Sequence, residues 1–205
     1  MFHTCRIVNR PVGKATRLQR SCGCWAILRA IRFHASRGSD SFGDNNKVGR
    51  HRVPERADIR IRAVTPADEA AWRRLWSSYL DFYETSVSEE VFGSSFARLL
   101  LEEENEFRGL LAEIDGEPVG LAHFLFHRHM WRTENVCYLQ DLFADPQVRG
   151  TGVGRALIEA VYAAADEAGC PSVYWLTQDF NTQARQLYDR IGTLTPFIRY
   201  NRRVA

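Results

Sequence analysis

The sequence predicts an α/β layered domain over residues 58–205, preceded by a basic arm over residues 1–57. Strand-like and helical hydrophobic patterns alternate along the domain, which indicates helices packed on a sheet. The chain has 205 residues, of which 45% are hydrophobic and 25% are charged, enough to bury one sizeable core. No apolar run approaches the roughly 18 residues that a membrane-spanning helix needs, so we expect no membrane role.

The arm and the domain differ in charge. Residues 1–57 hold twelve Lys and Arg against three acidic residues, a net charge of +9, whereas residues 58–205 carry a net charge of −7. An Arg-rich, acid-free start is typical of an organelle transit peptide, or of non-coding sequence translated ahead of a later start. Residues 38–46 are polar and turn-rich, so we expect the arm to be disordered. The arm holds few aromatic residues and the acidic domain repels polyanions, so we expect no nucleic-acid partner.

The domain begins with a strand and two helices. Residues 59–64 alternate like an edge strand. Thr65 is a favourable N-cap and Pro66 suits the first helical turn, which predicts a helix to about Phe82. A second helix is expected over residues 88–101. The apolar faces of the two helices are predicted to hold Trp72, Leu75, Trp76, Tyr79, Val91, Phe92, Phe96, Leu99 and Leu100.

The hydrophobic period then changes to that of a sheet. Residues 107–114 and 119–130 are strand-like, and the Asp115-Gly116 pair between them is a strong hairpin signal. A third strand is expected over residues 135–143.

The end of the domain alternates helices and strands. A helix is expected from the glycine-rich turn after the third strand to about Ala168. Residues 172–177 are expected to form a buried strand, Asn181 begins a helix that ends at Gly192, and residues 196–202 are expected to form a last strand.

The cysteines and histidines do not predict a metal site. The five cysteines are an odd number without zinc-ligand spacing, so we expect reduced thiols in the cytoplasm, or in an organelle if the arm directs import. His123, His127 and His129 share one strand parity, but a metal would need further ligands.

The most informative motif is the turn that opens the third helix, Arg149-Gly150-Thr151-Gly152-Val153-Gly154-Arg155. Glycines let the backbone wrap around an anion, and unpaired N–H groups at a helix start point toward it. The Walker A lysine is missing and the spacing differs from a Rossmann fingerprint. The residues alone therefore predict a phosphate-binding turn, with a plain structural turn as the alternative.

The neighbouring segments make the motif more specific. The spacing Arg149-x-x-Gly152-x-Gly154, the preceding strand over residues 138–144 and the later Asn181-x-x-Ala184-x-x-Leu187-Tyr188-x-x-x-Gly192 resemble the GNAT N-acetyltransferase superfamily. Within it, the chain looks most similar to the polyamine, histone and amino-acid N-acetyltransferase group. The resemblance covers residues 58–205. It implies a mixed, mostly antiparallel central sheet flanked by helices, acetyl-CoA as the co-substrate, no metal, and a homodimer.

The resemblance also implies roles for individual residues. The cofactor is expected to be bound by the backbone of the strand, by the glycine-rich turn and by one side chain before the last helix. These residues are Leu142, Phe143, Ala144, Arg149, Gly150, Thr151, Gly152, Val153, Gly154, Arg155 and Asn181. Tyr188 is expected to stand beside the thioester sulfur as the general acid, although its place on an apolar helix face also fits simple core packing.

Attack on a thioester requires a neutral amine, whereas free alkylamines are mostly protonated near neutral pH. A base must therefore take a proton. Related diamine acetyltransferases carry a carboxylate where this chain has Gln140, and an amide is not a base. Asp141 is the next residue, and its side chain is expected on the opposite face of the strand, since side chains alternate. The candidates for the base are therefore Asp141 and Glu134, each acting through a water molecule. A purely structural hydrogen bond would explain either carboxylate equally well.

The acceptor is expected to contact Tyr83, Glu84 and Gln140. For the acids Glu84 and Glu90, a solvated helix surface is as good an explanation as contact with the acceptor. A polyamine, an amino acid, a lysine side chain and an aminoglycoside all remain open as acceptors, and the acidic domain favours a cationic one. The alternative to an enzyme is a non-catalytic coenzyme A-binding regulatory module, which the amide at Gln140 favours.

Overall fold

The fold is a six-stranded sheet in the order β1-β2-β3-β4-β5-β6. The computed structural model describes Ile31–Arg32 and residues 58–203. Neighbouring strands run antiparallel from β1 to β5, whereas β5 and β6 run parallel. The mixed, mostly antiparallel sheet expected from the sequence is therefore confirmed. The strands are β1 (Ile31–Arg32), β2 (Ile59–Ala63), β3 (Arg108–Ile114), β4 (Glu117–Arg128), β5 (Asn135–Ala144) and β6 (Val173–Trp175).

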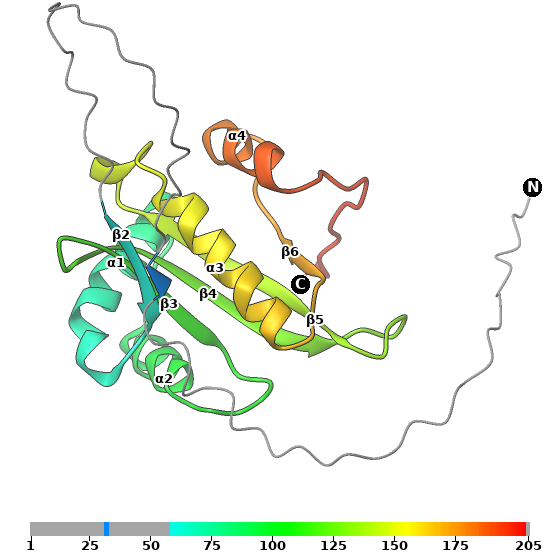
Figure 1. Ribbon diagram of the computed structural model, residues 1–205, viewed down its shortest axis with the longest axis horizontal. Helices are drawn as coiled ribbons and strands as arrows, with labels where there is room; N and C mark the ends of the chain where they lie inside the picture. Colours follow the sequence, from blue (N-terminus) through cyan, green and yellow to red (C-terminus); the bar gives the residue numbers. More distant parts are fainter. Residues whose placement is uncertain (1–30, 33–57, 204–205) are drawn as a thin grey trace, which may run out of the picture.

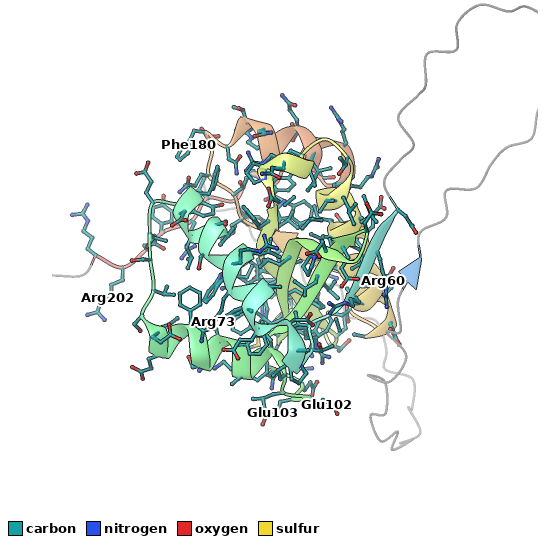
Figure 2. The ribbon with its side chains drawn as sticks, turned by 90° about the vertical axis from the view of Figure 1, so that its left-hand side faces the viewer. Arg60, Arg73, Glu102, Glu103, Phe180 and Arg202 are labelled. Carbon is teal, nitrogen blue, oxygen red and sulfur yellow. The ribbon has the colours of Figure 1, made fainter. Side chains whose placement is uncertain are left out.

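Helices cover both faces of this sheet (Figure 1). Helices α1 (Glu69–Phe82) and α2 (Glu89–Leu99) pack on one face around a core of Trp72, Leu75 and Phe96. Helix α3 (Val153–Glu167) covers the other face, and α4 (Thr182–Ile191) lies over the end of the sheet near β6. In the turned view, α1 lies in front of the sheet, and Glu102 and Glu103 lie at the lower edge of the domain (Figure 2).

A charged cluster fixes the entry into α1. A 3₁₀ turn, η2 (Pro66–Asp68), precedes the helix, and Asp68 accepts hydrogen bonds from both the backbone N–H and the hydroxyl group of Thr65. The Arg62 guanidinium contacts Asp68 at 2.7 Å and Glu113 of β3 at 2.6 Å. Hydrogen bonding from Arg62 lowers the pKa of Asp68 to about 2, against the usual 3.8. The ion pair therefore joins β2, β3 and the start of α1.

The expected hairpin and helix boundaries agree closely with the structure. Strands β3 and β4 meet at Asp115 and Gly116, which have φ angles of 53° and 84°. An Asp-Gly pair supports this turn because both residues adopt positive φ at low cost. On α2, Phe96 and Leu99 are buried as expected, but Val91 is exposed.

Three expectations differ from the structure. Within the arm, Ile31–Arg32 form a strand that pairs with Arg60 and Ile61, where no regular structure was expected; the other residues of the arm lie outside the described residues. Strand β6 is three residues long and half exposed rather than buried, because it lies at the free edge of the sheet. The strand expected over 196–202 is absent: this segment is exposed and pairs with no strand of the described chain.

Among the described residues, no helix is both long enough and apolar enough to cross a membrane.

Candidate active site

A β-bulge in β5 shapes the centre of the molecule. His123 of β4 pairs with Asp141, but the next residue, Phe124, pairs with Leu139, so Gln140 is an extra residue on β5. Strict alternation predicted that Gln140 and Asp141 point to opposite faces, and this was wrong. Because the bulge interrupts the alternation, the side chains of both residues meet α1: Gln140 at the surface and Asp141 in the interior.

The bulge lies where β5 and β6 separate. The parallel ladder between them joins only Cys137–Val173, Tyr138–Tyr174 and Leu139–Trp175. Beyond Leu139, the β5 residues that follow, Gln140 to Ala144, have β4 as their only strand neighbour within the described chain. This part of β5 therefore presents backbone N–H and C=O groups along one edge, as a template for pairing with an extended ligand.

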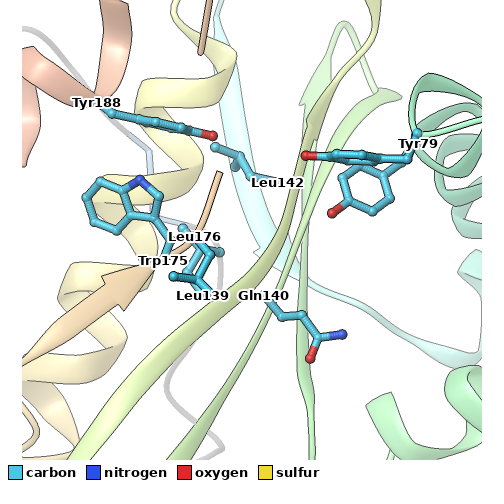
Figure 3. Close-up of a pocket in the computed structure, with 8 residues that line it drawn as sticks. Tyr79, Leu139, Gln140, Leu142, Trp175, Leu176 and Tyr188 are labelled. Atoms are coloured by element: carbon cyan, nitrogen blue, oxygen red, sulfur yellow. The ribbon is translucent and has the colours of Figure 1, made fainter. Parts of the chain in front are cut away.

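A pocket opens at this separation (Figure 3). Two tyrosines of α1 and its C-terminal end form one wall, Tyr188 of α4 forms the other, and β5 with β6 forms the floor. The hydroxyl group of Tyr188 points across the pocket toward the tyrosine wall at α1, with Leu142 between them (Figure 3), and Tyr83 of that wall is near enough to affect the pKa of Tyr188. The lining residues are Tyr79, Tyr83, Leu139, Gln140, Leu142, Trp175, Leu176 and Tyr188, and none of them is charged at neutral pH.

The glycine-rich turn leads from the end of β5 into α3. The 3₁₀ turn η3 (Pro146–Val148) follows β5, and Gly150 and Gly152 then adopt φ angles of 83° and 105°. Gly152 is the N-cap of α3, so no side chain caps the first N–H groups of this helix, and its first turn holds no acidic residue. An uncapped, acid-free helix start is a suitable anion site, since free N–H groups and the helix dipole point outward.

Close packing holds this turn beside the last helix. A Cβ atom on Gly154 would lie 3.2 Å from the Leu187 side chain of α4. Asn181 caps α4 by accepting a hydrogen bond from Ala184 N–H at 3.3 Å, and its amide group donates to Thr177 Oγ1. Asn181 is therefore held at the start of α4 and does not line the pocket.

A chain of polar side chains leads from the pocket into the core. The Trp72 indole N–H donates to His123 Nε2 at 2.8 Å, and His123 Nδ1 lies 2.9 Å from Asp141 Oδ2. Asp141 in turn faces the Tyr79 hydroxyl group, which borders the pocket. His123 and Asp141 are only 5% and 7% exposed.

Tyr79 and Tyr188 are both weak acids. Burial, followed by the negative charge of Asp141 and hydrogen bonding to it, raises the pKa of Tyr79 far above its usual value of 10. Burial also raises the pKa of Tyr188 to about 12. Both hydroxyl groups are therefore protonated at neutral pH, and the phenolate form of each is unfavourable.

The structure brings together only some of the predicted site residues. Tyr83, Gln140, Leu142 and Tyr188 line the pocket, whereas Asp141 reaches it only through Tyr79. Glu84 lines a separate, open hollow with Asp81, Thr85 and Ser86. Glu134 lies in the turn between β4 and β5, beside Arg132 and Thr133, and does not line the pocket.

Five contributors were not predicted from the sequence, and Leu139, on the floor of the pocket, is one of them. Tyr79 was assigned to the apolar face of α1, and His123 was considered only as one of three histidines on a strand. Trp175 and Leu176 were assigned to a buried strand, but the divergence of β6 turns them toward the pocket. The spacing of Tyr79 and Tyr83, four residues apart on one helix face, is the signal that could have indicated a polar wall.

The three histidines do not form a row. His123 is buried against Trp72, His127 Nε2 lies 3.0 Å from the Tyr174 hydroxyl group, and His129 lies beyond the end of β4. Within residues 58–203, no group of three or more His, Cys, Asp and Glu side chains is close enough to hold a metal ion.

Comparison with known proteins points to one family. The family model described as the Acetyltransferase (GNAT) family matches residues 70–193. The D-amino-acid N-acetyltransferase HPA3 of Saccharomyces cerevisiae is 39% identical over 145 residues, which cover 70% of this chain and 90% of the relative. The thialysine N-epsilon-acetyltransferase of Bos taurus is 34% identical over 91 residues, which cover 40% of this chain and 53% of that enzyme.

Solved structures agree on the fold. A structure of the aminoglycoside N-acetyltransferase AAC(6')-Iy in complex with CoA superposes with a TM-score of 0.63 at 20% sequence identity, covering 75% of this chain and 99% of that chain.

Proposed function

The chain belongs to the GNAT acetyltransferase family and is an acetyl-CoA-dependent N-acetyltransferase, and we propose that it acetylates the primary amine of a small amino-acid-type acceptor in the pocket between Tyr79 and Tyr188. The observation that carries this acceptor class is the neutral lining of the pocket. A polyamine would leave further ammonium groups to be neutralised, and Gln140 offers them an amide instead of a carboxylate. Relatives that act on a D-amino acid and on thialysine support the same class.

Acetyl-CoA supplies the acetyl thioester. Its pyrophosphate would be bound by the turn from Arg149 to Arg155, where the uncapped N-terminus of α3 is suited to an anion. Its pantetheine would pair with the backbone of Leu142, Phe143 and Ala144, because the separation from β6 leaves one edge of β5 available. Asn181 would add a hydrogen bond from its remaining amide donor.

We assign the base to Asp141 acting through Tyr79. The phenolic oxygen of Tyr79 accepts a proton from the acceptor nitrogen while its own proton passes to the Asp141 carboxylate. Because the pKa of Tyr79 is raised, the two transfers are concerted, and no phenolate persists. Asp141 thus gains the proton that the N–H bond loses.

We assign the acid to Tyr188. Its pKa of about 12 keeps the phenol protonated, so a proton is available for the departing thiolate as the C–S bond breaks. The Tyr188 phenolate then recovers a proton from Tyr79 by way of Tyr83, which interacts with both, and Tyr79 is reprotonated by Asp141. One proton has then moved from nitrogen to sulfur, and both tyrosines and Asp141 are restored.

The acceptor proposal is tested with the full chain by thiol release from acetyl-CoA. The acceptors are D- and L-amino acids, thialysine, spermidine, a lysine-rich peptide and an aminoglycoside, with the variant Tyr188→Phe as control. We expect turnover with amino acids or thialysine at a kcat/KM at least tenfold above that for spermidine. A preference for spermidine or the aminoglycoside contradicts the acceptor class, and binding of acetyl-CoA without any turnover contradicts the proposed roles of Tyr188 and Asp141.

We also propose that the protein is a homodimer. The segment after α4 carries four large hydrophobic residues that are 75% to 86% exposed: Leu194, Phe197, Ile198 and Tyr200. Exposed apolar residues gathered on one segment are typical of a surface that a partner covers. Light scattering after gel filtration should give twice the monomer mass, and Phe197→Asp should shift it toward the monomer. A monomeric wild type at micromolar concentrations contradicts this proposal.

A further inference from the structure

The pairing of His123 with Trp72 determines which ring nitrogen of His123 carries a proton. The Trp72 indole N–H is a donor only, and it lies 2.8 Å from His123 Nε2. Nε2 must therefore accept, which leaves the single proton of the neutral ring on Nδ1. Nδ1 then donates to Asp141 Oδ2 at 2.9 Å. A doubly protonated ring would direct one of its N–H groups against the indole N–H.

The surroundings of Asp141 add weight to this one donor. The carboxylate is 7% exposed, and the only basic side chain within 4 Å of it among the described residues is His123. The titratable groups that face the Asp141 carboxylate are His123 of β4 and Tyr79 of α1. Tyr138 of its own strand and Tyr83, which follows α1, are more distant. The α2 side chains on this side of His123 and Asp141 are apolar, since Phe92 and Phe96 pack against Trp72.

We propose that His123 is a positioning residue, which keeps the Asp141 carboxylate ionised and turned toward Tyr79 between turnovers. This proposal rests on the proposed role of Asp141 as the base. A neutral His123 that already holds its proton on Nδ1 accepts none from Asp141, so the proton that Asp141 gains in each cycle returns toward the pocket through Tyr79. At the inner end of this hydrogen-bonded series, the Trp72 indole N–H can only donate, so the proton on Asp141 leaves through Tyr79.

Two variants separate this role from simple packing. Asn at position 123 carries its amide nitrogen on Cγ, as His carries Nδ1, so His123→Asn retains a donor toward Asp141. His123→Leu fills a similar space without a donor. Both variants remove the acceptor of Trp72, so any loss of stability from that contact is shared by both.

The first readout is the pH dependence of kcat/KM for acetyl transfer. In His123→Leu, we expect the acid limb of the profile to move to higher pH by about one to two units, because this shift corresponds to the free energy of one hydrogen bond to a buried charge. The deficit relative to wild type should therefore shrink as the pH rises. His123→Asn should keep the wild-type limb. An equal loss in both variants at every pH would show that His123 only packs, and would overturn the proposal.

The second readout is independent of activity. Nitrogen NMR of the ¹⁵N-histidine-labelled wild type should show His123 as the neutral Nδ1–H tautomer. In Trp72→Phe, Nε2 is released from its donor, and the Nε2–H tautomer should become detectable. A wild-type ring that is charged, or that carries its proton on Nε2, overturns the proposal. Absence of turnover with every amine contradicts the proposed function instead, and the NMR result then decides the role of His123 alone.

Discussion

Replacing Tyr188 with phenylalanine removes one hydroxyl group and little else. The ring packs against Trp175 with centroids 5.4 Å apart, a contact that phenylalanine keeps. The hydroxyl group has no hydrogen-bond partner among the described residues, so its removal leaves no buried group unpaired. We therefore expect the free energy of unfolding to change by no more than about 0.5 kcal/mol.

The expected loss of activity is far larger. A positioned general acid contributes on the order of 10²–10⁴ in rate, so kcat should fall by at least about 100-fold, which corresponds to about 3 kcal/mol of activation free energy. The KM for acetyl-CoA should stay within a few-fold, because the turn from Arg149 to Arg155 is untouched. Since the pKa of Tyr188 is about 12, the phenol stays protonated below that pH, and the wild type should show no decline in kcat between pH 8 and 10 from loss of this acid.

Thiol release from acetyl-CoA under saturating substrates measures both effects. The matched control is Tyr174→Phe, which removes a phenol from the neighbouring strand β6 that bonds His127 and lies outside the pocket. Tyr174→Phe should keep wild-type activity within threefold. A Tyr188→Phe enzyme that retains more than a third of the wild-type kcat refutes the role of Tyr188, as does an equal loss in the control.

Three further predictions concern stability, cofactor binding and acceptor choice. The pKa of Asp68 is lowered from 3.8 to about 2, so its ion pair should contribute about 2 kcal/mol of stability above pH 4, and this contribution should disappear as the pH falls from 4 to 2. In denaturant unfolding, Asp68→Asn should remove this pH dependence of the free energy of unfolding. An unchanged pH dependence in the variant would contradict the prediction. Gly152→Ala places a side chain at φ 105° and should raise the KM for acetyl-CoA about tenfold with kcat little changed, whereas an unaltered KM would argue against binding at this turn. Gln140→Glu should raise the kcat/KM ratio of spermidine to amino acid by about tenfold, since it adds one negative charge at the pocket, and a constant ratio would count against Gln140 as an acceptor contact.

Most of the fold could be predicted because its signals are local. Thr65 and Pro66 mark the start of the first helix, Asp115-Gly116 marks the hairpin, and Gly152 marks the start of α3. Each of these residues acts through its own backbone or its immediate neighbours. The segment over 196–202 was expected to form a last strand, but a strand also needs pairing with a neighbour, and this segment pairs with no strand of the described chain.

The site was less predictable because it depends on one extra residue in a ladder. Alternation correctly describes β5 up to Leu139, and then the bulge at Gln140 changes the side on which every later residue lies. Nothing in the run Tyr138-Leu139-Gln140-Asp141-Leu142 marks this bulge, because its position is set by the pairing with His123 and Phe124 on β4. The partnership of Asp141 with His123 and Tyr79 is likewise a contact between distant segments, which periodicity does not reveal.

The bulge also brings the proposed binding edge and the proposed proton route to the same place. By adding one residue to β5, it turns Asp141 beneath α1, where His123 and Tyr79 are within reach of the carboxylate. At the same point β5 loses its pairing with β6, which frees the strand edge at Leu142 for an extended ligand. A thioester held along that edge would have its reacting carbon in the pocket that Tyr79 and Tyr188 line. The proposed position of the co-substrate and the proposed route of the proton thus both depend on a single irregularity in the sheet.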